Sequence, residues 1–202
     1  GGDAFCMLWD PKQKKVIGLN GSGRSPRGLS LETARRYAGT DGTLPSHGAV
    51  TVSVPGCVDA WWALHQRYGK LPWKRVFEPA IRHAEEGAPV IQNTAFYVES
   101  SHRAFTRPRT ETGIEEVENF KKLWAPDGKT PREGEIFKNP DLARTYRLIA
   151  EGGGRAFYEG EIAETIERYF KRIGGWMTKA DLAAHKTEGV PPPSVGVRVP
   201  GV

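Results

Sequence analysis

The chain has 202 residues, of which 38% are hydrophobic and 26% are charged, so its composition excludes a disordered protein and allows a buried core. The net charge of +5 comes from lysines and arginines scattered along the sequence, which disfavours a nucleic-acid-binding protein. No stretch approaches the roughly 20 apolar residues of a membrane span.

Two apolar runs near the start predict a β-hairpin. They cover residues 4–9 and 15–19, and a segment of turn composition lies between them. The loop that follows reads LNGSGRSPRG at residues 19–28, and Ser30 is placed to cap a short helix after it. A further strand is predicted at residues 48–56, before Pro55-Gly56 ends the run.

Most of the remaining chain is predicted to be helical. The clearest helix has Val58, Trp61, Leu64 and Tyr68 on one face and ends at Gly69, so we expect Trp61 to be buried. Further helices are predicted at about 73–86, at about 91–104, from Asn139, at about 160–173 and after the TKAD motif at 178–181. Residues 106–135 contain many prolines and glycines and are expected to form an irregular loop or a flap.

The residues alone do not make a convincing catalytic set. The five histidines lack the spacing of metal ligands, and no metal site or cofactor is predicted. Ser22 and Ser25 lack the G-x-S-x-G elbow of a serine nucleophile. Cys6 and Cys57 sit among apolar residues and are expected to be buried and free, with a disulfide as the alternative.

The ends of the chain suggest a piece of a longer protein. The sequence begins inside a strand-like run without an initiator methionine or a signal peptide, and it ends in a proline-rich tail. No linker or internal repeat separates two domains. We therefore expect residues 1–202 to form a single partial domain.

Four segments carry a resemblance to a known family. They occur in order and read GGDAFCMLWD, VSVPGCVDAWWALHQRYGKLPWKRVFEPAIRHAEEGAPV, NPDLARTYRLIAEGGGRAFYEGEIAETI and GGWMTKADLAAHK. Together they resemble the large-subunit region of the gamma-glutamyltransferase family. The resemblance covers most of residues 1–188, is poor over residues 101–125, and leaves out the last fifteen residues.

The resemblance implies an α+β fold, the αββα sandwich of N-terminal-nucleophile hydrolases. This chain would be the helix-rich large-subunit part, with a small sheet near its start. In the family, a precursor cuts itself into two subunits. The new N-terminal threonine of the small subunit then cleaves gamma-glutamyl amides such as glutathione, and passes the acyl group to water or to an amino acid. No cofactor is implied.

The resemblance also implies which residues take part. The nucleophilic threonine lies in the small subunit, so no catalytic residue is expected in this chain, which alone should be inactive. The large subunit contributes an arginine that holds the donor's carboxylate, in a stretch resembling D-G-R-E-T-A-P. Ser22 stands in that arginine's place in NGSGRSP, and Arg24 follows two residues later, roughly 6–7 Å further along an extended chain. Arg24 and Ser22 are thus the candidate substrate-binding residues, and the alternative is that Arg24 is an ordinary turn arginine.

Two other functions remain open. The NGSGR form resembles a branch of the family that includes oxamate amidohydrolase, so the substrate could be a small carboxylate-bearing amide. A non-catalytic binding module is a possibility from another class. The expected partners are the small subunit of the same precursor and a small-molecule amide, with neither nucleic acid nor a membrane span in this chain.

Overall fold

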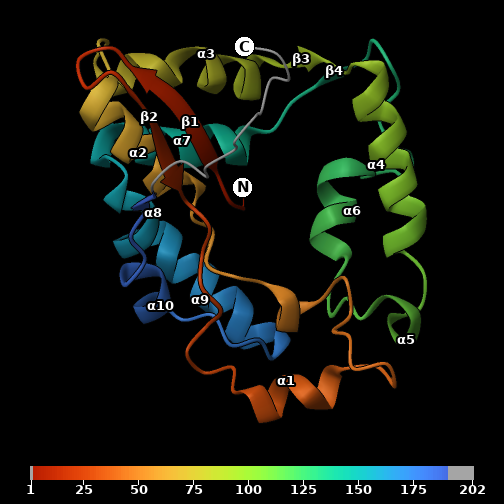
Figure 1. Ribbon diagram of the computed structural model, residues 1–202. Coiled ribbons are helices and arrows are strands. Elements are labelled where there is room, and N and C mark those ends of the chain that lie inside the picture. The colour runs from red at the N-terminus through yellow and green to blue at the C-terminus, as the bar shows by residue number, and fades with distance from the viewer. Residues whose placement is uncertain (1, 191–202) are drawn as a thin grey trace, which may run out of the picture.

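A β-hairpin opens the fold, as the two apolar runs predicted (Figure 1). The strands β1 (Phe5–Asp10) and β2 (Lys15–Asn20) pair antiparallel along their whole length. In the computed structural model, which describes residues 2–190, the strand β5 (Glu188–Val190) adds to the free edge of β2. The sequence did not predict β5. Its register sets Glu188 opposite Asn20, beside the start of the glycine-rich loop.

The chain is α+β, with most of its elements helical, as predicted. The helices are α1 (Leu31–Tyr37), α2 (Cys57–Tyr68), α3 (Trp73–Glu86), α4 (Gln92–Phe105), α5 (Arg109–Thr112), α6 (Glu118–Trp124), α7 (Pro140–Gly152), α8 (Arg155–Glu159), α9 (Glu161–Ile173) and α10 (Lys179–Ala183). A second, two-stranded sheet pairs β3 (Ala88–Pro89) with β4 (Ile136–Phe137).

The helix caps read from the sequence are confirmed. The side-chain oxygens of Ser30 and Asn139 each accept a hydrogen bond from a backbone N–H in the first turn of α1 and α7. Thr178 and Asp181 form the reciprocal capping box of α10. Helix α3 continues through Pro79 as one element.

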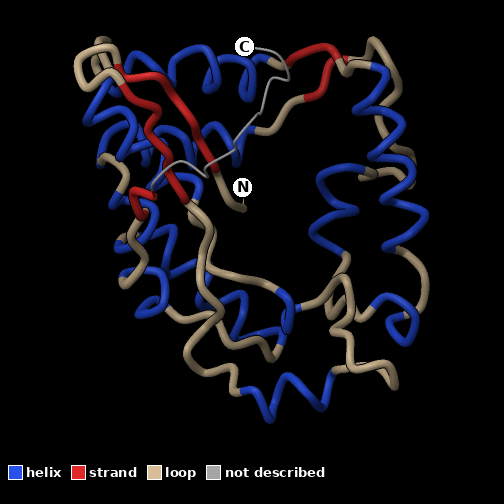
Figure 2. Tube along the Cα trace, viewed as in Figure 1, coloured by secondary structure: helices blue, strands red, loops and turns tan. Residues whose placement is uncertain are grey.

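The buried core is formed mainly by residues of α2, α3 and α7 to α10. Helix α2 covers one face of the three-stranded sheet, and α3 and α7 pack against each other beyond it (Figures 1 and 2). The most deeply buried side chains include Ile149 of α7, Tyr158 of α8 and Leu182 of α10. On the other face of the sheet, the β1 side chains Phe5, Met7 and Trp9 are exposed.

Helices α4, α5 and α6 lie on the opposite side of the molecule from the three-stranded sheet (Figures 1 and 2). The expectation of an irregular loop at 106–135 is therefore wrong in part, since α5 and α6 fall inside it. Phe120 of α6 packs on Phe105 of α4, with their ring centroids 5.3 Å apart. Residues of this segment have weak intrinsic helix propensity, and contacts with residues outside it stabilise them as helices.

The strand predicted at 48–56 is wrong. Residues Ala49–Thr51 form a 3-10 turn, and the chain then runs extended without a partner strand. Gly48 has a φ of 97°, which breaks strand geometry, and the Val54 N–H donates to the Arg24 carbonyl 3.0 Å away. The segment is thus fixed against the glycine-rich loop rather than in a sheet.

The predicted phase of α2 is also wrong. Trp61 is 38% exposed, whereas Val58 is buried and Gln66 and Arg67 are exposed as expected. The neighbouring Trp62 turns inward, where its ring contacts that of Trp73 at a centroid distance of 5.0 Å. Its indole lies over Gly153 and Gly154, whose missing side chains leave room for it.

This phase leads to a test of the two tryptophans. Trp62→Ala is expected to lower the free energy of unfolding by about 2 kcal/mol, somewhat less than a fully buried tryptophan would cost. Trp61→Ala is the matched control and is expected to cost less than about 1 kcal/mol, as for other surface substitutions. Urea unfolding of the 202-residue chain measures both. A larger loss for Trp61→Ala than for Trp62→Ala would contradict the helix phase in the structure.

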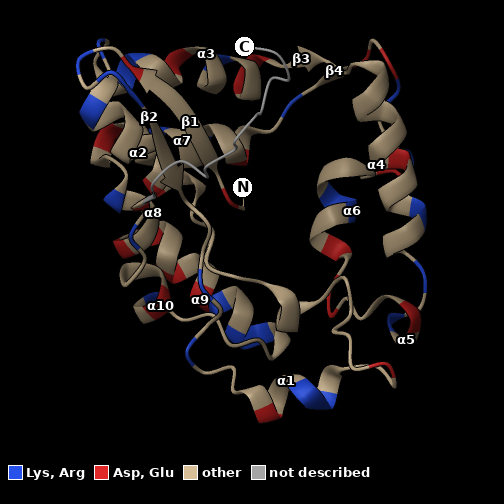
Figure 3. Cartoon of the chain, in the orientation of Figure 1, with Lys and Arg blue, Asp and Glu red and all other residues tan. Residues whose placement is uncertain are grey.

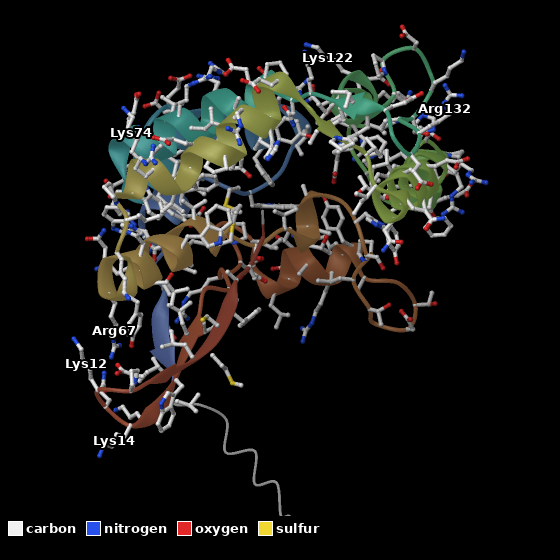
Figure 4. All side chains as sticks on the ribbon, turned by 90° about the horizontal axis from the view of Figure 1, so that it is seen from above. Lys12, Lys14, Arg67, Lys74, Lys122 and Arg132 are labelled. Atoms are coloured by element: carbon white, nitrogen blue, oxygen red, sulfur yellow. The ribbon has the colours of Figure 1, made fainter. Side chains whose placement is uncertain are left out.

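Charged residues of both signs occur on helices and loops in most parts of the chain that the structure describes (Figure 3). Lys12 and Lys14 extend from the tip of the hairpin, while Lys122 and Arg132 lie on the far side of the molecule (Figure 4). Within residues 2–190, no helix is long and apolar enough to cross a membrane. The same residues contain no His, Cys, Asp or Glu cluster able to hold a metal ion. Cys6 and Cys57 are both free, Cys57 buried and Cys6 half-buried.

Candidate functional site

The loop at residues 20–24 is held by hydrogen bonds at nearly every residue. The Asn20 side-chain oxygen accepts from both the N–H and the hydroxyl of Ser22, at 2.9 and 2.7 Å, which closes an Asx turn. The N–H groups of Gly21 and Gly23 donate to the Ala4 carbonyl and to the Asp3 carboxylate. The loop is therefore a fixed platform on which the Arg24 side chain stands.

The glycines allow the loop to lie directly on a neighbouring segment. A Cβ added to Gly23 would lie 1.6 Å from the Val54 carbonyl oxygen, and one added to Gly56 would lie 2.0 Å from the Gly21 carbonyl oxygen. Neither position has the positive φ that only glycine adopts easily. Glycine is required here because two backbones pack closely.

A pocket of about 410 Å³ opens beside this platform. Its lining joins the loop after β2 to the segment around α10 and β5. The residues are Asn20, Ser22, Gly23, Arg24, Ser25, Arg27, Val54, Asp181, Ala184, His185, Lys186 and Glu188. Both predicted substrate-binding residues, Ser22 and Arg24, thus line one pocket.

Arg24 forms an ion pair with Glu188 across this pocket. Its Nη2 donates to the Glu188 Oε1 at 2.9 Å, and the two side chains are 87% and 60% exposed. The pair joins residues 164 positions apart, which the β2–β5 pairing brings together. Ser22, in contrast, directs its hydroxyl to its own loop.

Asp181 is the second acidic residue of the pocket, and its carboxylate is used in the fold. One oxygen accepts from the Arg27 N–H at 3.0 Å, and the other accepts from the N–H and hydroxyl of Thr178. Burial raises the pKa of Asp181, but these hydrogen bonds outweigh burial and hold that pKa below its usual value. Asp181 therefore fixes the loop after Arg24 against α10 as an ionised carboxylate.

The wall of the pocket rests on Tyr158. The buried Tyr158 hydroxyl donates to the Pro55 carbonyl at 2.8 Å and accepts from the Asp59 N–H at 3.0 Å. The ring stacks on His185, with centroids 5.4 Å apart. Arg155 donates to the carbonyls of Ala183 and His185, which fixes the turn after α10.

His185 is a buried ionisable group that lines the pocket, at 7% exposure. Burial lowers its pKa, although the nearby Asp59 carboxylate opposes this, so the imidazole is neutral near pH 7. From the sequence, His185 was only one of five histidines that lack the spacing of metal ligands, and no role was predicted for it. The signal that could have found it is its place in GGWMTKADLAAHK, one of the four ordered segments.

The arrangement can bind an anion, but it lacks an activated nucleophile. The pocket is lined by two carboxylates and three cationic side chains, which are Arg24, Arg27 and Lys186. One of the carboxylates, Asp181, is already hydrogen-bonded to backbone N–H groups. Across residues 2–190, no Ser, Thr or Cys side chain is hydrogen-bonded to a histidine ring, the pairing that would activate it.

Comparison with known proteins gives consistent matches. The gamma-glutamyltranspeptidase family profile matches residues 1–200, and so includes the tail that the motif resemblance left out. The glutathione hydrolase-like YwrD proenzyme of Bacillus subtilis is 34% identical over 98% of the chain and 35% of its own length. The oxamate amidohydrolase proenzyme of Klebsiella pneumoniae is 32% identical over 92% of the chain and 34% of its own length.

A solved structure supports the fold. Cephalosporin acylase from Bacillus halodurans aligns with a TM-score of 0.85 and 40% identity, over 98% of this chain and 36% of that one. The chain therefore spans about a third of the length of the relatives it matches.

Proposed function

Because the chain belongs to the gamma-glutamyltranspeptidase family, we propose that it is the substrate-carboxylate-binding part of an enzyme that cleaves amides by acyl transfer. The observation that carries this proposal is the pocket beside the 20–24 loop, where a fixed backbone presents an exposed arginine. Residues 1–202 then form a single partial domain that corresponds to the large subunit of a two-subunit protein.

In the proposed reaction, a threonine at the N-terminus of a partner subunit attacks the amide carbonyl of the donor. Its hydroxyl proton passes through its own α-amine to the leaving amine, and an acyl-threonine ester forms. Water or an amino acid then attacks the ester, releases the acyl group and restores the threonine. The role of this chain is to hold the donor so that its carbonyl carbon meets the nucleophile.

Arg24 is the proposed carboxylate-binding residue, and Ser22 is the proposed second contact. A guanidinium can bind a carboxylate through two parallel N–H···O bonds, which fixes both the position and the orientation of the donor. The Asx turn and the Val54–Arg24 hydrogen bond hold the backbone of this arginine in place. In this proposal the donor is a gamma-glutamyl amide such as glutathione.

A small carboxylate-bearing amide such as oxamate is the second candidate donor. The position of the arginine favours this candidate. Ser22 stands where the family motif has its arginine, and the arginine of this chain, Arg24, comes two residues later. Such a shift changes the distance between the bound carboxylate and the scissile amide. The relative from Klebsiella pneumoniae, an oxamate amidohydrolase proenzyme, supports the same choice.

The test compares the 202-residue chain with the full-length protein that carries it. The chain alone is expected to turn over neither gamma-glutamyl-p-nitroanilide nor oxamate. The full-length protein is expected to cleave itself and then to turn over at least one of them. If the chain alone turns over either substrate, and substitution of a residue in this chain abolishes that activity, the active site is not divided between two subunits. A full-length protein that neither cleaves itself nor turns over an amide would favour the non-catalytic binding module.

A further inference from the structure

We propose that Glu188 is a specificity-determining residue, which competes with the donor's carboxylate for Arg24. The inference rests on the proposed role of Arg24 and adds a second residue, from the opposite end of the described chain. The Glu188 carboxylate already makes the contact with the guanidinium that a donor carboxylate would make, at 2.9 Å.

The fold fixes where Glu188 can reach. Strand β5 pairs with β2 in a register that sets Glu188 opposite Asn20, the first residue of the loop that carries Arg24. Just before it, the Thr187 N–H donates to the Asp59 carboxylate at 2.6 Å, which ties the strand to α2. The backbone of Glu188 is thus anchored on both sides, while its side chain is 60% exposed.

The contact itself is easily replaced. Both partners are largely exposed, and ion pairs of this kind contribute little because water solvates both charges well. Only Nη2 of Arg24 bonds to Glu188, so one of the five guanidinium N–H donors is used. A donor carboxylate that binds two guanidinium N–H groups forms the stronger pair and displaces Glu188.

The other charges of the pocket favour this exchange. Asp181 is bound by the Arg27 N–H and by Thr178, so it is not available to Arg24. Arg27 and Lys186 line the same pocket and offset the negative charge of an incoming acid. With Glu188 and a donor carboxylate both on Arg24, two like charges would lie side by side, which disfavours sharing. Glu188 therefore acts as an internal competitor that admits only donors with a well-placed carboxylate.

The test uses the mature full-length protein and the variants Glu188→Gln, Arg24→Ala and the double variant. Glutamine keeps the shape of the side chain and removes its charge. With gamma-glutamyl-p-nitroanilide or oxamate, whichever is turned over, Glu188→Gln is expected to lower KM about threefold with little change in kcat. In the Arg24→Ala background the same change is expected to have no effect, because nothing remains to compete for.

Glu32→Gln is the control, because Glu32 forms an exposed ion pair with Arg36 in α1. The KM of this variant is expected to match that of the unmodified protein. If Glu188→Gln leaves KM unchanged or raises it while Arg24→Ala impairs the enzyme, competition by Glu188 is wrong and the role of Arg24 stands. If Arg24→Ala has no effect, the proposed carboxylate-binding role fails, and the inference about Glu188 fails with it.

Discussion

Arg24→Ala is expected to lower kcat/KM for a carboxylate-bearing amide by about 10²-fold or more in the mature full-length protein. The substitution would remove the proposed charge-assisted, two-bond contact with the donor, which is expected to be worth about 3 kcal/mol. It leaves the loop intact, because the Arg24 backbone carbonyl still accepts from Val54 and the side chain is 87% exposed. Self-cleavage is expected to proceed normally, since that step involves no donor carboxylate.

Two further variants separate charge from geometry at this position. Arg24→Lys keeps the charge but lacks the planar fork, and it is expected to recover only part of the lost kcat/KM. Arg67→Ala removes an exposed arginine at the end of α2 and is the matched control, with unchanged kinetics expected. Steady-state kinetics with gamma-glutamyl-p-nitroanilide and oxamate measure all three. Unchanged kinetics for Arg24→Ala on both substrates would make Arg24 a surface turn residue.

Gly23→Ala is expected to destabilise the protein by about 3 kcal/mol or more, since overpacking against a rigid group is costly. The added Cβ would fall 1.6 Å from the Val54 carbonyl oxygen, and within 3.0 Å of the Val54 Cα. Both are backbone atoms, so no rotation of a side chain can relieve the clash. The loop must move off the 54–56 segment, and the Val54–Arg24 hydrogen bond breaks.

Gly28→Ala provides the control for this prediction. It adds the same methyl group a few residues further along, where the nearest atom is 3.7 Å away, an ordinary contact. Denaturant unfolding of the 202-residue chain gives the loss of stability for both variants. Equal stability of the two variants would show that the loop does not lie on the 54–56 segment. In the full-length protein, Gly23→Ala is also expected to impair the enzyme, because Arg24 moves with the loop.

Local patterns in the sequence determined most of the secondary structure and the family. The hairpin, the caps at Ser30, Asn139 and Thr178, and the Gly69 end of α2 follow from short-range hydrogen bonding and apolar spacing. The four ordered segments were enough to indicate the family, because they combine helix faces and turn residues over long stretches. These features depend on neighbours in the chain, so they can be read without the fold.

Only the tertiary structure decided the rest of the site. Spacing alone placed Trp61 in the core, but Gly153 and Gly154, far along the chain, leave room for Trp62 and so set the phase of α2. The partner of Arg24 lies 164 residues away, on a strand that has no signal of its own and forms only by pairing with β2. Residues 48–56 have strand composition but find no partner strand, and they support the loop instead. In each case a contact between distant segments determines the outcome, and the local pattern holds no information about that contact.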